Sequence, residues 1–312
     1  MIILSSSTLH SLISCPRKFI LNNASPARSA SLATEVGTAV HQAMQAGTET
    51  GTSASPEAHR AAMQALLRRY PFGMWQDAKP AERKVRSILS CAVAVDNALD
   101  TLDANGFRLA EVNGRKASEL DFLLSFQHAY GEHREHSVAS GVAYSGSIDS
   151  VFVDAYGAPV ITDYKTTVKD IALASLQYAH SMQACIYAIV LSQALCIPAT
   201  DISYQYIIIK LDDGLGEIQV ERKRVTAESI AEATAYLRFY IGCLERMMNA
   251  KYFPQQHDAC VAFNRPCFFA NECDGAHMKA AIEQAERADC SYRYAYLDTG
   301  KTDYDIRGTL TL

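Results

Sequence analysis

The sequence has no long apolar run. Its apolar stretches, such as the region around Ile186–Leu191, are interrupted by Ser, Gln or Tyr well short of the roughly 18 residues that a membrane-spanning helix needs. Basic residues are missing before the short apolar segment at the N-terminus, and no clear small-residue cleavage site follows it, which argues against a secretory signal. We therefore expect no membrane partner and a protein that works in the cytoplasm.

The chain also has little excess of charge of either sign. Its 29 Lys and Arg residues and 34 Asp and Glu residues give a formal net charge of −5. This balance argues against a protein that coats nucleic acid with its whole surface, but it is compatible with a local basic groove. Because 49% of the 312 residues are hydrophobic, a sizeable core can form, so we expect one large globular domain or two modest ones. We find no internal repeats.

Nine cysteines are an odd number for a set of disulfides, and in a reducing compartment clustered cysteines bind metal more often than they pair. Cys290 has no assigned role. Four others lie in apolar helical stretches, where we expect small buried hydrophobic residues: Cys91, Cys185, Cys196 and Cys243. The remaining four are candidates for a metal site: Cys15, Cys260, Cys267 and Cys273.

Local patterns predict an α/β fold in which helices pack on a mostly antiparallel sheet. The expected helices are a serine-capped segment within SSSTLHSLISCPRKF, broken near Cys15, and residues 32–46, 56–70, 81–103, 171–195 and 227–250, the last capped by Thr226. β-branched and aromatic segments bounded by turn residues predict strands in ASELDFLLSF, VAYSGSIDSVFVD, APVITDYKTT, DISYQYIIIKL and GEIQVERKRV.

The segment GSIDSVFVDAYGAPVITDYKTT carries the most informative set of charges. If its two strands form a hairpin with the turn about Tyr156, antiparallel pairing places Asp149 opposite Asp163. The two-residue period of a strand places Lys165 on the same face as Asp163. Facing carboxylates repel each other unless a divalent cation lies between them, and their hard oxygens suit Mg²⁺ or Mn²⁺. Such an ion activates water, and a nearby lysine can neutralise charge that develops on a phosphate.

An isolated Asp-x-Lys pair is more often a solvated surface feature. Here four spaced pairs occur together along the chain: Gly37 and His41, Gly146 and Asp149, Asp163 and Lys165, and Gln183 and Tyr187. Their order resembles the RecB-like branch of the PD-(D/E)XK nucleases, whose motifs are G-x-x-x-H, G-x-x-D, (D/E)-x-K and Q-x-x-x-Y. Taken singly, the histidine could be an ordinary helix residue and the Gln–Tyr pair a half-buried helix face.

This resemblance implies a restriction-endonuclease-like core, with a mixed, mostly antiparallel central sheet flanked by helices, a helical N-terminal insertion and a C-terminal cysteine-rich loop. An additional acidic residue is also expected on the strand before the G-x-x-D motif. The implied site residues are His41, Asp149, Asp163 and the backbone carbonyl of Tyr164 as metal ligands, Lys165 as the catalytic lysine, Gln183 and Tyr187 beside the site in contact with DNA or the attacking water, and Glu119, preferred to Asp121 and Glu111, as the additional acid.

A second set of residues lies in the loop-rich segment FPQQHDACVAFNRPCFFANEC. Its cysteines are spaced Cys260-x6-Cys267-x5-Cys273, and the distant Cys15 is the natural fourth thiolate. This distribution resembles RecB-like nucleases that carry a [4Fe–4S] cluster, including CRISPR adaptation nucleases and helicase–nuclease subunits, although their commoner triplet is C-x2-C-x5-C. A four-cysteine zinc site is the main alternative, and unliganded thiols are the other. Either cofactor would fasten the two ends of the chain together as a staple.

We interpret residues 1–312 as a single nuclease domain. Its expected parts are N-terminal helices with Cys15 and His41 at 1–46, a helical insertion at 47–115, the nuclease core at 116–225, and a helix with the iron–sulfur region and tail at 226–312.

The expected activity is hydrolysis of DNA phosphodiester bonds by an exonuclease, in replication, recombination, repair or defence. A phage or bacterial origin is plausible, and a helicase or another recombination protein is a candidate partner. One alternative is a non-catalytic DNA-binding or assembly subunit that acts through a helicase or integrase. Another is a zinc-stapled RNA-binding module, which would need an aromatic and basic single-strand platform that we do not find in the sequence.

Overall fold

The structure is a computed structural model that describes residues 2–24, 31–127, 142–179, 181–212, 216–262, 265–287 and 304–311. The chain forms two compact units, each assembled from separate stretches of sequence. Unit 1 comprises Met1–Arg28, Asp121–Gly146 and Ala231–Leu312, and unit 2 comprises Ser29–Leu120 and Ser147–Ile230.

Unit 2 contains most of the helices and strands. Its helices are α3 (Leu32–Glu49), α4 (Pro56–Arg69), α5 (Phe72–Asp77), α6 (Pro80–Val85), α7 (Ile88–Ala104), α8 (Ile171–Ala179), α9 (Gln183–Leu195) and the 3-10 turn η2 (Ala199–Asp201). Its strands are β2 (Arg108–Leu109), β3 (Glu111–Val112), β4 (Arg115–Lys116), β7 (Pro159–Thr167), β8 (Ser203–Lys210) and β9 (Ile218–Arg224), with parts of β5 (Ser118–Gln127) and β6 (Val142–Val153).

The sheet of unit 2 is mixed. β6 pairs antiparallel with both β2 and β7, β7 pairs parallel with β8, and β8 pairs antiparallel with β9. A parallel pair needs a crossover, which α8 and α9 provide between β7 and β8. The expected mixed α/β architecture is therefore confirmed.

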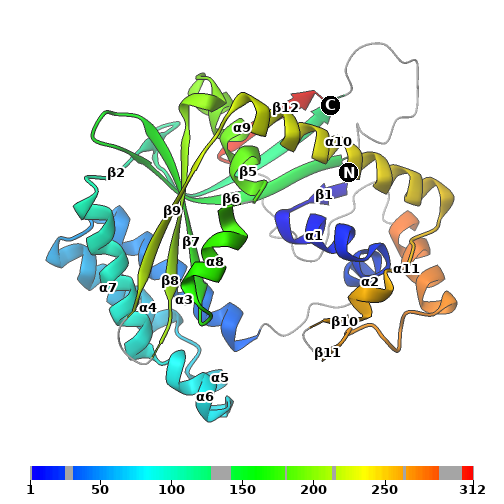
Figure 1. Cartoon of the computed structure of the whole chain (residues 1–312), viewed down its shortest axis with the longest axis horizontal. Coiled ribbons are helices and arrows are strands. Elements are labelled where there is room, and N and C mark those ends of the chain that lie inside the picture. The colour runs from blue at the N-terminus through cyan, green and yellow to red at the C-terminus, as the bar shows by residue number, and fades with distance from the viewer. Residues whose placement is uncertain are drawn as a thin grey trace. The chain divides into compact units, whose positions relative to one another are not determined.

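Helices cover both faces of this sheet. On one face, Val36 and Val40 of α3 and Val95 of α7 pack with Tyr164 and Ile207 of the strands in one buried cluster. On the other face, α8 contacts β8 and β9, and α9 contacts β8. In Figure 1, the blue and cyan helices α3, α4 and α7 lie on one side of these strands and the green helix α8 on the other. The predicted helical insertion thus folds as part of unit 2.

Unit 1 contains the two ends of the chain. Its elements are β1 (Ile2–Leu4), α1 (Ser6–Ser14), α2 (Pro16–Ala24), most of α10 (Ala227–Ala250), the 3-10 turn η3 (His257–Cys260), β10 (Val261–Ala262), β11 (Arg265–Pro266), α11 (Gly275–Arg287) and β12 (Ile306–Thr311). β1 pairs parallel with the first residues of β6, and β12 pairs parallel with β5. Helix α11, near the C-terminus, packs against α2, near the N-terminus.

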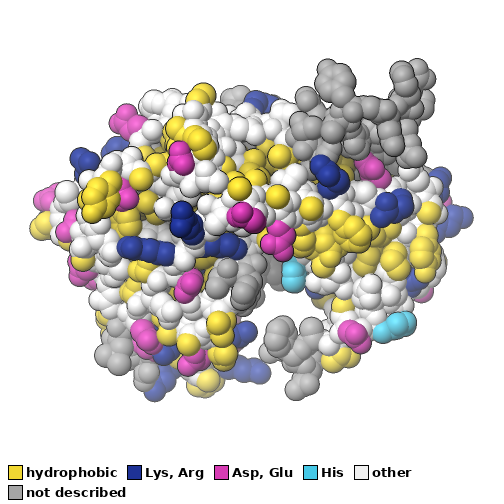
Figure 2. Space-filling model, turned by 45° about the horizontal axis from the view of Figure 1, so that its top comes forward, with side chains coloured by type: hydrophobic (Ala, Val, Ile, Leu, Met, Phe, Trp, Pro, Cys, Tyr) yellow, Lys and Arg dark blue, Asp and Glu magenta, His cyan; other side chains and the backbone are white. Residues whose placement is uncertain are grey.

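The surface and helices agree with the composition. On the face drawn in Figure 2, Lys and Arg side chains in dark blue are interspersed with Asp and Glu side chains in magenta. Every helix in the described ranges is too short or too polar to cross a membrane.

The sequence predictions for the strands and for α10 are confirmed. Each of the five predicted strand segments contains a strand, and α10 has the predicted bounds. Thr226 caps α10, because its Oγ1 accepts the N–H of Ser229 at 3.2 Å. The N-terminal helix is also interrupted where predicted, since Cys15 caps the end of α1 and Pro16 begins α2.

Two predicted helices are each divided in two, with a serine near each division. Residues 81–103 are divided between α6 and α7, because the side chain of Ser87 accepts the N–H of Ser90 at 3.1 Å and starts a new helix. Residues 171–195 are divided between α8 and α9, where Ser181 Oγ accepts the N–H of Gln183 at 3.2 Å. A serine side chain that binds nearby backbone competes with the continuous helix. The second division makes Gln183 the first residue of α9.

Candidate functional site

The predicted hairpin register is confirmed, and the two strands separate at Asp149. β6 and β7 pair from Val153 and Pro159 to Ser150 and Thr162, which is the register that places Asp149 opposite Asp163 one step further. At that step the Tyr164 N–H of β7 donates to a side chain of β6 instead of a backbone carbonyl, since Asp149 Oδ2 accepts it at 2.9 Å. The backbone of β7 therefore holds the Asp149 carboxylate in place.

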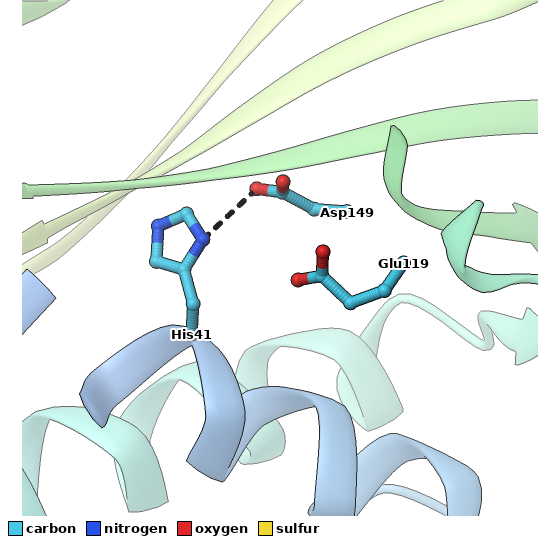
Figure 3. Close-up of side chains that lie close together, drawn as sticks. All are labelled: His41, Glu119 and Asp149. Carbon is cyan, nitrogen blue, oxygen red and sulfur yellow. Dashed lines mark ion pairs between the residues drawn. The ribbon is translucent and has the colours of Figure 1, made fainter. Parts of the chain in front are cut away.

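Three potential metal ligands meet beside this separation. His41 of α3, Glu119 of β5 and Asp149 of β6 each offer a ligand atom, and these atoms all lie within 4.8 Å of one another (Figure 3). His41 Nδ1 lies 3.4 Å from Asp149 Oδ2. All three residues are half-buried, so they are shielded from bulk water but still accessible. Two carboxylates and an imidazole form a donor set that suits divalent metal ions.

A close approach between α3 and β7 sets the position of His41. A methyl group added at Gly37, one helical turn before His41, would lie 3.3 Å from Thr166 Oγ1 of β7. Only a glycine lets the helix come this near without a shift of its neighbour. The His41 ring meets the buried Tyr164 ring edge-on, with centroids 6.0 Å apart. The spacing of the glycine and the histidine thus has a physical reason.

Glu119 reaches the group through an unusual backbone conformation. Its φ is 49°, in the left-handed region, which costs an L-residue about 1–2 kcal/mol. Ser147 Oγ donates to Glu119 Oε2 at 3.1 Å and orients the carboxylate. Sequence reasoning missed Ser147, although it lies inside the G-x-x-D motif. Of the other two acids considered, Glu111 is exposed on β3 and Asp121 belongs to unit 1.

Asp163 is buried and turned towards other partners. It is 1% exposed, forms an ion pair with Lys165, and its Oδ1 accepts the amide N–H of Gln183 at 2.9 Å. Among the described residues it is not part of the group of three. Burial raises the pKa of Asp163 to about 6, the Lys165 ammonium opposes this shift, and the Asp149 carboxylate adds to it. The ion pair shows that the side chains of Asp163 and Lys165 lie on the same face of β7, as predicted.

Lys165 remains a cation in this setting. Burial alone would lower the pKa of its ammonium, but the carboxylates of Asp163 and Asp149 outweigh that effect and hold the pKa above its usual value. Tyr187, one turn after Gln183, is 5% exposed and packs beside Tyr204, with ring centroids 6.4 Å apart. Gln183 thus contacts Asp163, a predicted metal ligand, whereas Tyr187 is buried and packs against Tyr204.

The four clustered cysteines all belong to unit 1. Cys15 closes α1, and its N–H donates to the Ser11 carbonyl at 2.9 Å. Cys260 and Cys267 flank the small β10–β11 hairpin and face each other, since the Cys267 N–H donates to the Cys260 carbonyl at 2.6 Å. Cys273 follows within a short loop before α11.

Arg17 connects the N-terminal helices with the cysteine loop. Its guanidinium donates to the carbonyl of Phe253 at 3.1 Å, to Gln255 Oε1 at 3.3 Å and to the carbonyl of Cys273 at 3.3 Å. It also lies 4.0 Å from the Cys273 sulfur. Because Arg17 is two residues after Cys15, the segment that carries the distant cysteine is attached to the segment that carries the triplet.

The other cysteines differ from the prediction in part. Cys91 and Cys185 are buried, as expected, and Cys243 is half-buried. Cys196 is exposed, so the prediction of a core position is wrong for it. It occupies the C-cap of α9 with a left-handed φ of 55°, a conformation that ends the helix and turns the residue out of its apolar face. Cys290 lies outside the described residues.

Comparison with known proteins gives one family. The family model of the PD-(D/E)XK nuclease superfamily matches residues 3–274. The chain is 12% identical to the crystal structure of a candidate exonuclease from Eubacterium rectale, over 88% of this chain and 93% of that one, with a TM-score of 0.45. It is 11% identical to the crystal structure of SSO0001, over 72% of this chain and 83% of that one, with a TM-score of 0.25. No curated protein sequence matches it.

Proposed function

Because this chain belongs to the PD-(D/E)XK nuclease superfamily, we propose that it hydrolyses phosphodiester bonds of DNA with the help of a divalent metal ion. The observation that carries the proposal is the group formed by His41, Glu119 and Asp149, whose ligand atoms lie within 4.8 Å of one another. Two of these residues stand on motifs that the sequence singles out, and they come from different elements of unit 2.

Mg²⁺ or Mn²⁺ is the ion that we assign to this group. Carboxylate oxygens are hard donors. Without a cation, the half-buried carboxylates of Glu119 and Asp149 would repel each other. His41, Glu119 and Asp149 would hold the ion, and Asp163 and the carbonyl of Tyr164 would join them by the family pattern. The ion, when bound, activates water and offsets charge on the phosphate.

The remaining roles fall to residues of the chain itself. Lys165 supplies a lasting positive charge that can stabilise the phosphate as negative charge develops on it. Gln183 donates to Asp163 Oδ1 and fixes the direction of that carboxylate, so we assign it as a positioning residue. Tyr187 would act less directly, by packing against Tyr204.

The finer assignment is an exonuclease of the RecB-like branch. The order of the four motifs supports it, and the close approach of Gly37 to Thr166 gives the first motif a structural purpose in this chain. Activity at DNA ends, in replication, recombination, repair or defence, and a helicase or another recombination protein as partner belong to the same proposal.

We further propose that Cys15, Cys260, Cys267 and Cys273 hold a [4Fe–4S] cluster that acts as a structural staple. Arg17 supports the meeting of the two chain ends, since it binds the carbonyl of Cys273 from the helix that follows Cys15. A closed zinc site needs thiolates about 3.8 Å apart, given Zn–S bonds of about 2.3 Å. An iron–sulfur core is larger, and one distant cysteine with a local triplet favours it over a zinc site, which usually uses two local pairs of cysteines.

A cleavage assay tests the nuclease proposal. End-labelled and circular DNA are incubated with the protein in Mg²⁺, Mn²⁺, Ca²⁺ or EDTA. We expect cleavage of the linear DNA from its ends in Mg²⁺ or Mn²⁺ and none in Ca²⁺, which is a poorer activator of water, or in EDTA. Lys165→Ala should abolish cleavage while the thermal midpoint shows a folded protein. Equal cleavage in EDTA would remove the metal mechanism, and DNA binding without cleavage in any metal would favour the non-catalytic subunit.

A further inference from the structure

A cavity of about 420 Å³ lies where β8 begins and β9 ends. Its lining includes Phe107, Tyr156, Gln205 and the basic residues at the end of β9, and every lining residue belongs to unit 2. None of the residues that we assign to the metal or to catalysis lines it. Val160, also in its wall, lies three residues before Asp163 on β7, which is about 10 Å along a strand. The cavity is therefore separate from the candidate active site but belongs to the same sheet.

The walls of the cavity are positively charged. Three consecutive basic residues of β9, Arg222, Lys223 and Arg224, line it, against one acidic residue, Asp154. The Asp154 carboxylate is used by the hairpin turn, because its Oδ1 accepts the N–H groups of Tyr156 and of residue 158 at 2.9 Å. Arg224 is exposed and has no hydrogen-bond or ion-pair partner in the described part of the chain. The Lys223 ammonium donates to the Ser181 carbonyl, which is not part of the lining, and Arg222 donates to Asn105 Oδ1 in the wall at 2.9 Å. Arg222 and Arg224 are therefore the two cations that favour a negatively charged ligand such as a phosphate.

Gln205 adds a polar group that lacks a partner. The residue is 1% exposed and lines the cavity, and its amide Nε2 donates to Thr162 Oγ1 at 2.9 Å. Its Oε1 is buried and accepts no hydrogen bond from any described residue. An unsatisfied buried acceptor is costly. This oxygen is sealed from solvent, so the Gln205 amide would have to turn into the cavity to accept an N–H from a ligand.

Tyr156 adds an aromatic surface beside these groups. It stands at the turn between β6 and β7, lines the cavity and is 95% exposed. Exposed aromatic rings next to basic side chains are the usual platform on which proteins stack the bases of single strands. The cavity thus combines an aromatic face, a buried acceptor and two arginines.

We propose that this cavity binds one nucleotide unit of a DNA strand. Its base would stack on Tyr156 and donate an N–H to Gln205 Oε1, and its phosphate would pair with Arg222 and Arg224. The inference rests on the proposed function, because it takes DNA as the substrate. The distance of about 10 Å along β7 corresponds to about three stacked nucleotides.

Binding without cleavage tests this proposal. The full-length protein in EDTA is titrated with fluorescein-labelled (dT)12 by anisotropy at several salt concentrations, with dTMP as a competitor. We expect Arg222→Gln/Arg224→Gln to weaken (dT)12 binding roughly tenfold and to reduce the salt slope by about 0.7, because the variant no longer neutralises one phosphate of the strand. Arg60→Gln, at an exposed arginine of α4 outside the cavity, is the matched control and should change neither quantity.

Gln205→Leu supplies an independent arm. Loss of an uncharged acceptor should weaken (dT)12 binding while the salt slope stays that of the wild type. A thermal melt shows whether Gln205→Leu, at a buried position, folds. If it does not, the binding data for Arg222→Gln/Arg224→Gln decide whether the cavity binds the strand. Wild-type affinity in the double arginine variant, or equal weakening in Arg60→Gln, would overturn the proposal.

One further outcome distinguishes a nucleotide of a DNA strand from a free nucleotide. Another distinguishes failure of the cavity proposal from failure of the nuclease proposal. Loss of dTMP binding with unchanged (dT)12 binding in Arg222→Gln/Arg224→Gln would mean a site for free nucleotides and would overturn the strand assignment. If the wild type cleaves no DNA in Mg²⁺ or Mn²⁺ and the double variant still loses (dT)12 affinity, the cavity stands and the nuclease proposal fails.

Discussion

The two candidate metal sites of this chain are built in opposite ways. His41, Glu119 and Asp149 come from a helix and two strands of unit 2, and the backbone brings their ligand atoms within 4.8 Å of one another. The cysteines of unit 1 come from a helix end and from loops around a hairpin of two-residue strands. Regular elements bring the proposed hard ligands together without an ion, whereas we expect the cysteines to need a cofactor for their final arrangement. The two sites should therefore respond differently to loss of a ligand.

The largest effect is expected at the carboxylate site from Asp149→Asn. The variant keeps the side-chain size but loses a charge in the metal set, so cleavage in Mn²⁺ should fall on the order of 10³-fold. Because strands and helices hold the site, the thermal midpoint of the metal-free protein should change little. The control is Glu111→Gln, at an exposed acid of β3 outside the group. A wild-type rate in Asp149→Asn would show that the pre-arranged group is not the active centre.

At the cysteine site, Cys15→Ala should remove the cofactor and lower the stability together. A missing thiolate costs both the cluster and the link between the chain ends, because metal binding and folding are coupled there. Iron and sulfide per chain, with thermal midpoints, are measured for Cys15→Ala and Cys267→Ala under anaerobic conditions. Cys243→Ala, in α10, serves as the control. Full iron content in Cys15→Ala would disprove the long-range staple.

A smaller effect is expected from Glu119→Gln. This carboxylate is one of three clustered ligands and is oriented by Ser147, so its loss should weaken Mn²⁺ binding by roughly 10- to 100-fold. Isothermal titration with Mn²⁺ measures the change, and Ser147→Ala should cause a lesser loss in the same direction. If the affinity for Mn²⁺ is unchanged in Glu119→Gln, Glu119 is not a metal ligand, and its left-handed φ of 49° has only a structural role.

The smallest effect is expected from Gly37→Ala. The added methyl group would lie 3.3 Å from Thr166 Oγ1 and push α3 away from β7, which displaces His41 by a fraction of an ångström. Cleavage should fall roughly tenfold, since small misplacements of a site reduce rates. Thr166→Ala removes the contacted atom and should restore much of the rate in the double variant. No rescue by Thr166→Ala would place the effect elsewhere in α3.

The pairing of Asp149 and Asp163 could be predicted because the β6–β7 hairpin has few alternative registers. A short turn about Tyr156 and a two-residue period leave one register, and the observed pairing from Ser150 and Thr162 to Val153 and Pro159 is that register. The left-handed conformation of Glu119 has no such signal, because a glutamate with positive φ follows no sequence pattern. Beyond the resemblance, the sequence therefore carries no signal that favours Glu119 over Glu111 and Asp121.

Side-chain direction is the other part that periodicity did not supply. The register predicts the face on which Asp163 stands, but its contact with Gln183 depends on where α9 begins. Cys196 was assigned to the core by the apolar stretch around it, and the helix end that exposes it depends on its left-handed φ of 55°. Contacts set by helix ends need the three-dimensional structure.

Anomalous diffraction at the manganese and iron edges would show which metal each of the two sites binds. Crystals of anaerobically purified protein are grown with MnCl₂, and the two edges distinguish manganese from iron. We expect manganese among His41, Glu119 and Asp149, and iron among Cys15, Cys260, Cys267 and Cys273. Manganese bound elsewhere with the three ligands empty, or zinc in place of iron at the four cysteines, would contradict the assignment of a hard site to unit 2 and a soft cluster to unit 1.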